Sequence, residues 1–459
     1  MLKDLSVAGA FAARRGPEKE KTIMETMVPA VIRARFVAAV LLTAASSMAQ
    51  VIAPDPGCTV SDAWTEQKSP WTDTVGVTNT SYPDANATYW IRWLNEGPPA
   101  AQSPATIHGQ FPASRYMSLS LYDSNEDELD SIDDSNIAPD PGQNNPFQTA
   151  GPQGTYTITI VYGTAPAMPA ANTLYTGGQT VVKVFYRVYY PDSSGNLTGG
   201  TSDPVLPAIT VFGGAMPTCA PRPIISPITN TVWGRLDQTD FTGVKPAQGP
   251  TGVFSSPIWK ITGGTGNNAN ADNTYMGTYL SRDFLTATTP LLVVKFKAPT
   301  FPNTQNGVPP YTSGEQVRYW SLCTDEPLTS AVARCVPDGQ AAILNGYATF
   351  VISDPSNQPS ASVLSQWGAT WIAWGALEYS TDFLYNENYQ PLTSADGAFY
   401  YNVLLYRQTL ASSSFQQSMA NISRLPTILQ KAAMGAYWPV SGYCSVAQFQ
   451  SAGAGCIAQ

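Results

Sequence analysis

A strand pattern that occurs twice is the feature of this sequence that most constrains its fold. Residues 115–123 (RYMSLSLYD), 155–163 (TYTITIVYG) and 181–190 (VVKVFYRVYY) alternate polar and apolar side chains and are rich in Val, Ile, Tyr and Thr. Alternation with a period of two, in residues of this kind, is typical of a strand that buries one face. The first half of the chain is therefore predicted to form antiparallel β-sheet.

The second half repeats these strands in the same order. Its residues 318–323 (RYWSLC) match RYMSLS, 346–353 (GYATFVIS) match GTYTITIVYG, and 403–408 (VLLYRQ) match VFYRVY. A fourth match aligns MGTYLSRDF with NATYWIRWL, and so Tyr279 with Tyr89. Four matches in one order at similar spacing predict a duplicated β-domain.

The length and composition agree with two all-β units. A chain of 459 residues exceeds one ordinary core, and 36 Gly, 38 Pro and 12% charged residues favour short strands and turns over helices. We predict two tandem antiparallel β-sandwich or jelly-roll-like domains, at residues 50–216 and 231–459, joined by a proline-rich linker at 217–230. Residues 413–438 are predicted to be helical, with a break or restart at Pro426.

The N-terminus has the pattern of an export signal. Arg33 and Arg35 precede an apolar stretch that ends in the small-x-small sequence Ser47-Met48-Ala49. This stretch is shorter than the roughly 20 residues that span a bilayer, so residues 1–49 are interpreted as a presequence and signal peptide, with a retained anchor as the alternative. We expect a mature chain that begins near Gln50, has no membrane span, and acts in the periplasm or outside the cell.

The mature chain is strongly acidic. Residues 1–49 hold seven of the 24 basic and four of the 33 acidic residues, which leaves 17 basic, 29 acidic and a net charge of −12. Because binding to nucleic acid or anionic lipid relies on basic residues that neutralise phosphates, the net charge argues against both.

All six cysteines follow the proposed cleavage site: Cys58, Cys219, Cys323, Cys335, Cys444 and Cys456. An even number in an exported chain indicates three disulfides. The pairs Cys323/Cys335 and Cys444/Cys456 would each close a short loop, and Cys58/Cys219 would tie the start of the first domain to its end. A zinc site is the weaker alternative, because close Cys-x-x-Cys pairs are lacking and His108 is the one histidine in the chain.

A resemblance follows from GQFPASRYMSLSLYD, GTYTITIVYG, ANTLYTGG and VFYRVYYPD, which lie within residues 82–212. The stretch resembles secreted bacterial proteins that carry a β-sandwich domain of unknown function, often beside a second related domain. The resemblance implies the fold and an envelope or extracellular location, and brings no catalytic residues with it.

Residues 121–142 (LYDSNEDELDSIDDSNIAPDPG) are rich in Asp and Glu and contain no Lys or Arg. The favoured interpretation is a solvated turn. A calcium site is the second, because closely spaced carboxylates are calcium ligands, although the EF-hand spacing is absent. Its predicted ligands are Asp123, Asp127, Asp130, Asp133 and Asp134. The third is a catalytic pair drawn from Asp133, Asp134 and Asp140, since two carboxylates can run glycoside hydrolysis.

Aromatic residues and an arginine are candidate ligand-binding groups: Trp90, Trp93, Arg115, Trp371 and Trp374. Sugars stack their apolar C–H faces on such rings, and arginine holds anions through its planar fork. The alternatives are burial of the rings in a core and a salt bridge across the sheet.

These observations predict an exported tandem β-sandwich protein that binds carbohydrate or has a surface-structural role. One alternative is a cofactor-independent glycoside hydrolase or lyase that uses the acidic stretch, and another is a small-molecule or lipid binder. Neither a Walker loop nor a Rossmann fingerprint is present, so a nucleotide cofactor is not expected, and calcium is the one cofactor considered.

Overall fold

The structure is a computed structural model of the chain. It describes residues 63–67, 82–95, 104–191, 206–211, 214–215, 219–223, 257–262, 268–302, 314–327, 332–375 and 400–457, with backbone alone at 63–67, 88, 95, 191, 211, 214–215, 219–223 and 262. The predicted signal peptide, Cys58 and the side chain of Cys219 lie outside these residues. We call the part up to residue 223 the first half and the part from residue 257 the second half.

The first half forms two sheets, with strand orders β11-β1-β2-β8-β4-β5 and β10-β9-β3-β6-β7. Its strands are β1 (Ala63–Gln67), β2 (Ala87–Asn95), β3 (Ala105–Gln110), β4 (Ser114–Tyr122), β5 (Glu128–Asp133), β6 (Thr155–Val161), β7 (Thr173–Tyr175), β8 (Val181–Pro191), β9 (Ala208–Val211), β10 (Gly214–Ala215) and β11 (Cys219–Pro223).

The second half forms sheets in the orders β12-β13-β20-β15-β16 and β17-β18-β14-β21, with β19 also paired to β18. Its strands are β12 (Lys260–Thr262), β13 (Asn273–Ser281), β14 (Leu291–Lys297), β15 (Tyr319–Asp325), β16 (Val332–Pro337), β17 (Ile343–Leu344), β18 (Tyr347–Ser353), β19 (Ala369–Ala373), β20 (Tyr401–Thr409) and β21 (Val440–Cys444).

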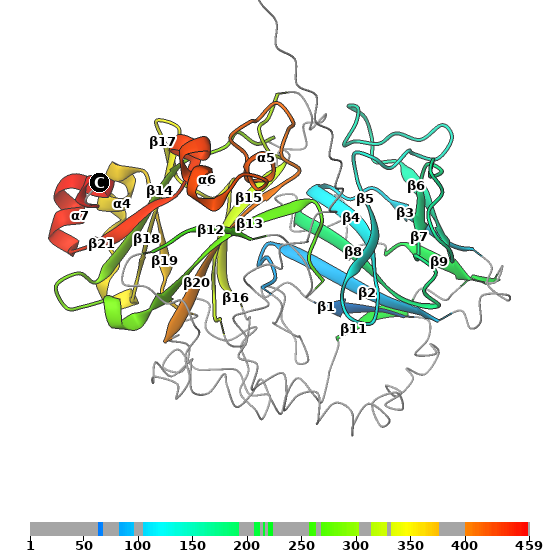
Figure 1. Ribbon diagram of the computed structural model, residues 1–459, viewed down its shortest axis with the longest axis horizontal. Coiled ribbons are helices and arrows are strands. Elements are labelled where there is room, and N and C mark those ends of the chain that lie inside the picture. Colours follow the sequence, from blue (N-terminus) through cyan, green and yellow to red (C-terminus); the bar gives the residue numbers. More distant parts are fainter. Residues whose placement is uncertain are drawn as a thin grey trace, which may run out of the picture.

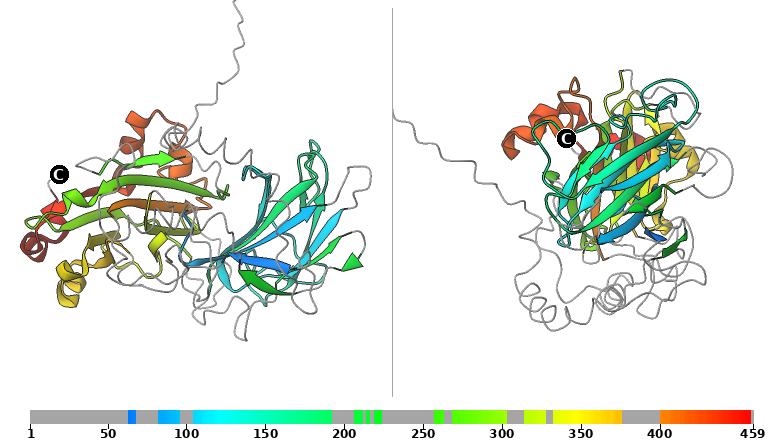
Figure 2. Two further views of the ribbon diagram at one scale, coloured as in Figure 1. Left: turned by 90° about the horizontal axis from the view of Figure 1, so that it is seen from below. Right: turned by 90° about the vertical axis from the view of Figure 1, so that its right-hand side faces the viewer.

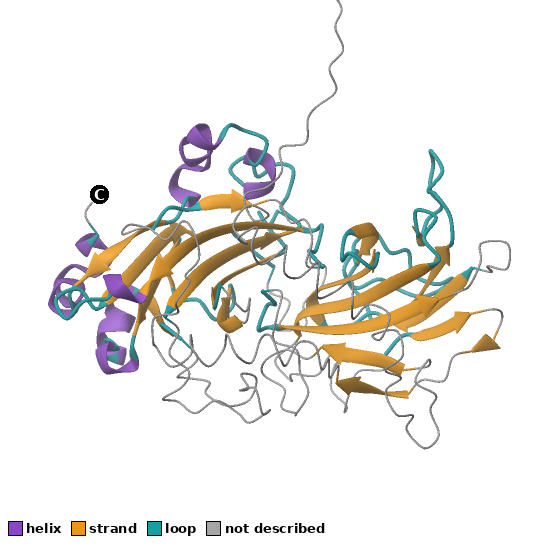
Figure 3. Ribbon diagram, turned by 60° about the horizontal axis from the view of Figure 1, so that its bottom comes forward, coloured by secondary structure: helices purple, strands orange, loops and turns teal. Residues whose placement is uncertain are grey.

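The described helices are short and all lie in the second half, as Figure 3 shows. They are α4 (Ala361–Trp367), α5 (Met419–Ile422), α6 (Thr427–Met434), α7 (Val446–Ala452) and the 3-10 turns η3 (Arg282–Phe284), η5 (Pro355–Asn357), η7 (Gly435–Tyr437) and η8 (Gly453–Cys456). Serine hydroxyls begin three of them: Ser360, Ser418 and Ser445 each accept a backbone N–H from the first turn.

Each half is a β-sandwich with its own core. In the first half, Met117 and Leu119 of β4 and Val184 of β8 meet Ile107 of β3 and Ile158 of β6 from the other sheet. A matching core in the second half joins its two sheets through residues such as Leu322, Val294, Phe350 and Leu404. The inward-facing residues alternate with others along each strand, as the sequence pattern predicted.

The two halves share their pairing register as well as their strand order. Arg187 of β8 lies opposite Tyr89 and Ser118, and Arg407 of β20 lies opposite Tyr275 and Ser321.

The fourth sequence match is therefore shifted by four residues, because Tyr275 rather than Tyr279 corresponds to Tyr89. The better match is DANATY at residues 84–89 with NADNTY at residues 270–275.

The halves lie side by side along the long axis of the molecule and pack through the sheets that contain β8 and β20 (Figures 1 and 2). The contact is aromatic: Tyr116 and Tyr189 of the first half form one buried cluster with Tyr319 of the second. The rings of Tyr189 and Tyr319 meet edge to face, with centroids 5.7 Å apart. The two sheets that meet at this contact are thus covered on both faces, and every residue of β4, β15 and β20 is buried.

The all-β prediction is confirmed, and so is the helical segment, which Pro426 divides into α5 and α6. Two of the three predicted disulfides are present, Cys323–Cys335 and Cys444–Cys456. Within the described residues, no helix has the length and apolar character needed to cross a membrane.

Candidate functional site

Three buried ion pairs cross between the halves: Arg407 with Asp84, and two that repeat one arrangement, Arg115 with Asp338 and Arg318 with Asp134. Arg115 Nη1 donates to Asp338 Oδ1 at 2.7 Å, and Arg318 Nη1 donates to Asp134 Oδ1 at the same distance. All four side chains are almost completely buried. Arg115, a predicted ligand-binding residue, is therefore part of a buried ion pair, which joins the two halves rather than crossing one sheet as its alternative interpretation had it.

Both carboxylate oxygens of Asp134 accept hydrogen bonds. Its second oxygen accepts the backbone N–H of Met117 at 2.8 Å. Burial raises the pKa of Asp134 to about 7, and the Arg318 guanidinium opposes that rise. Asp338 is bound in the same way, because its second oxygen accepts the backbone N–H of Trp320. Burial raises the pKa of Asp338 to about 6, and the Arg115 guanidinium opposes that rise.

The other two predicted catalytic acids are also in local contacts. Asp133 accepts from the backbone N–H and hydroxyl of Ser135 and from the amide of Asn136, which fixes the turn after β5. Asp140 accepts from the hydroxyl of Thr155 at 2.7 Å, and its carboxylate lies 3.4 Å from the exposed ring of His108. The structure does not bring Asp133, Asp134 and Asp140 into one pocket among the described cavities.

The five predicted calcium ligands do not converge either. Asp123 caps the β4–β5 turn by accepting the N–H groups of Asn125 and Asp127, and Asp130 accepts those of Ser131 and Tyr175. In the described part of the chain, the one group of three metal-ligating side chains close together is Asp84 with Cys323 and Cys335. Those two cysteines form a disulfide, so this group is not a metal site.

The predicted sugar-stacking tryptophans are mostly core. Trp90 stacks on Tyr186 inside the first sandwich, Trp374 is fully buried, and Trp371 is nearly so. Trp93 differs, because 49% of it is exposed and the ammonium of Lys183 lies 5.4 Å from its ring centroid.

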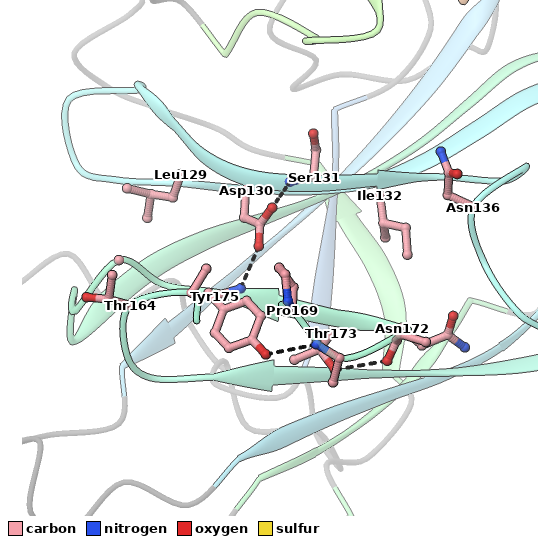
Figure 4. Close-up of a pocket in the computed structure, with 14 residues that line it drawn as sticks. Leu129, Asp130, Ser131, Ile132, Asn136, Thr164, Pro169, Asn172, Thr173 and Tyr175 are labelled. Atoms are coloured by element: carbon pink, nitrogen blue, oxygen red, sulfur yellow. Dashed lines mark hydrogen bonds between the residues drawn. The ribbon is translucent and has the colours of Figure 1, made fainter. Parts of the chain in front are cut away.

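A pocket opens at the edge of the first sandwich, where β5 and β7 end their respective sheets (Figure 4). Its volume is about 450 Å³. Polar and apolar groups line it together: Leu129, Asp130, Ser131, Ile132, Asn136, Thr164, Ala165, Pro169, Ala170, Ala171, Asn172, Thr173, Tyr175 and Gly177. The hydrogen bond from the backbone N–H of Tyr175 to Asp130, 2.8 Å long, joins the two edge strands within the lining of the pocket.

The corresponding edge of the second sandwich is filled. Thr173 pairs with the fifth residue of β6, and Trp371 pairs with the fifth residue of β18. Asp130 lies opposite Leu121 of β4, three residues before the partner of Ser118. Arg334 lies opposite Thr324 of β15, three residues before the partner of Ser321, and so at the matching place. Arg334 donates to the carbonyl oxygen of Trp371 at 3.4 Å. Two large side chains thus stand where the first half has Thr173 and Asp130.

Sequence reasoning found Asp130 but missed the β7 side of the pocket. Asn172, Thr173 and Tyr175 lie in ANTLYTGG, a stretch used above only for its resemblance. It also missed Asp84, which accepts from Arg407, Tyr319 and Ser321 across the interface.

No family model and no curated protein matches the sequence. Among solved structures, an uncharacterised protein from Burkholderia cenocepacia is similar, with 11% identity, a TM-score of 0.46, and coverage of 90% of this chain and 96% of that one. A Vibrio parahaemolyticus protein has 10% identity, a TM-score of 0.35, and coverage of 73% and 87%. Both TM-scores are below 0.5, so function is argued from the residues of this chain.

Proposed function

We propose that the protein is an exported binding protein that holds a hydroxyl-rich ligand, such as a sugar unit of a glycan, in the pocket between β5 and β7. The observation that carries the proposal is the lining of this pocket. Carboxylate, amide and hydroxyl groups of Asp130, Asn136 and Thr173 stand beside the apolar side chains of Ile132 and Pro169. Polar groups that take hydroxyls beside apolar ones that take C–H faces suit a carbohydrate.

Binding is favoured over hydrolysis. Of the residues that line the pocket, Asp130 alone is acidic, whereas glycoside hydrolysis commonly uses two carboxylates. Both oxygens of Asp130 also accept backbone N–H groups. The backbone therefore already binds both oxygens of this carboxylate.

Two features support an extracytoplasmic role. The signal-like N-terminus predicts export, and the two disulfides are of the kind that persists in oxidising compartments. Intact mass of the secreted protein before and after reduction tests this proposal. A start near Gln50 and six cysteines in disulfides are expected, whereas free thiols on the native protein would contradict it.

We also infer that the two halves arose by duplication of one sandwich. The shared strand order and the register around Arg187 and Arg407 support this inference. So does the backbone, because Tyr82 and Asn268 have positive φ angles of 51° and 55° at matching places before β2 and β13. Within the described residues the two copies differ at this edge, because Trp371 and Arg334 of the second half stand where the first half has Thr173 and Asp130 of the pocket.

Substitution Thr173→Trp tests the pocket by copying the residue of the second half. We expect it to abolish binding on a glycan array and in calorimetry with the glycan that wild type selects, while the melting temperature changes little. Ser356→Trp, at an exposed turn of the second half, is the matched control and should bind as wild type does. Equal binding by wild type and Thr173→Trp would remove the pocket as the site.

A further inference from the structure

Helix α6 presents an apolar stripe outward instead of inward. Met434 and Gln430, four residues apart, are the buried positions of this helix, and the Gln430 amide donates to the carbonyl of Leu425. The opposite side of the helix carries apolar residues at the spacing of one helical face, Ile428, Leu429 and Ala432, and the exposed Leu425 comes just before the N-cap Pro426. Ile428 is 87% exposed and Leu429 is 51% exposed.

The charges around this stripe differ in sign from those of the whole protein. Residues 397–459 contain no Asp or Glu, although the chain has 33 acidic residues in all. The exposed charges beside the stripe are Arg424 and Lys431. The net charge of the whole chain is negative although the charge near the stripe is positive. Because charges more than about 8 Å apart are largely screened at physiological salt, the local charge decides how this surface interacts with a charged partner.

We propose that α6 docks on an anionic lipid surface. Its outward stripe would enter the boundary between headgroups and acyl chains, and Arg424 and Lys431 would meet the lipid phosphates. Figure 1 shows that α6 and α5 lie on the outside of the second half, clear of the contact between the halves. A bilayer could therefore approach α6 without disturbing the buried ion pairs or the pocket.

Vesicle sedimentation of the mature protein tests this proposal. We expect binding to phosphatidylcholine vesicles that contain phosphatidylglycerol and much weaker binding to phosphatidylcholine alone. Ile428→Ser/Leu429→Ser should abolish it, and Arg424→Gln/Lys431→Gln should weaken it by about fivefold per residue. The matched control is Ile343→Ser/Leu344→Ser in β17, where two apolar residues are 42% and 44% exposed away from α6.

Three results would each overturn the proposal. The first is a wild-type protein that stays in solution with the anionic vesicles, and the second is a β17 control that loses binding as fully as the α6 variant does. The third is a concentration-dependent dimer in light scattering that Ile428→Ser/Leu429→Ser abolishes, because the stripe would then join two copies of the chain. Melting curves of the variants should match wild type, since the substituted side chains face solvent.

Discussion

Arg115 and Arg318 exchange partners across the contact between the two halves. Arg115 is the second residue of β4, and Arg318 comes just before β15, the matching strand of the second half. Each binds an aspartate just beyond the edge strand that pairs with the matching strand in the other half. Each aspartate also binds the backbone of its own half, because Asp134 accepts the N–H of Met117 and Asp338 accepts the N–H of Trp320. The halves are thereby joined by self-complementary contacts, as in an isologous dimer.

This exchange predicts how charge substitutions combine. Arg318→Ala should lower the free energy of unfolding by about 3–5 kcal/mol, because it leaves Asp134 buried without its partner. The double variant Arg318→Asp/Asp134→Arg should recover much of the loss seen in either charge-reversed single variant. Urea unfolding of the four proteins measures the coupling.

The matched control reverses two charges within one half. Arg115→Asp/Asp134→Arg would place Asp against Asp338 and Arg against Arg318, so it should be less stable than both singles. Were this variant as stable as the cross-half swap, the reciprocal pairing would be wrong.

Stability should fall as the pH rises from about 4 to about 7. Burial raises the pKa of Asp134 to about 7 and those of Asp338 and Asp272 to about 6, above the ordinary value of 3.8. The folded state then holds protons that the unfolded state releases, so this contribution is full below pH 4 and lost above pH 7.

Thermal melts between pH 4 and pH 8 check this prediction. Asp134→Asn cannot titrate at that position, so its melting temperature should depend less steeply on pH in this range. A wild-type protein that becomes more stable from pH 5 to pH 7 would contradict the assignment of raised pKa values.

The sequence predicted what depends on local pattern. Strand alternation identified β4, β6 and β8, and Pro426 marked the break before α6. It could not show where Asp134 or Trp371 would go, because both are placed by contacts with residues far along the chain. Acidic residues crowd together in sequence at 121–142, yet alternation along β5 and the turns beside it send their side chains in different directions.

Calcium removal should leave the melting temperature unchanged. Asp123, Asp130 and Asp133 already accept backbone N–H groups, so the acidic stretch is ordered by its own turns. Differential scanning calorimetry with excess chelator and with millimolar calcium checks this. A site filled at a hundredfold excess over its Kd would add about 2.7 kcal/mol, so a clear upward shift lost in Asp133→Ala would restore the calcium hypothesis.

Two cysteines introduced into the first half should form a disulfide at the place that matches Cys323–Cys335 of the second half. Cys323 and Cys335 are direct cross-strand partners in β15 and β16, and Ser120 and Ser131 are direct partners at the matching places in β4 and β5. We expect Ser120→Cys/Ser131→Cys to oxidise spontaneously during export, and intact mass with alkylation before and after reduction would detect the bond. The net gain in stability should be small, because the hydrogen bond from Arg187 to the Ser120 hydroxyl is lost, at a cost of about 1–3 kcal/mol, while closing so short a loop contributes about 3 kcal/mol. Ser120→Cys alone should show the loss without the bond. Free thiols in the double variant, in a protein that folds, would mean that the two halves do not share this register.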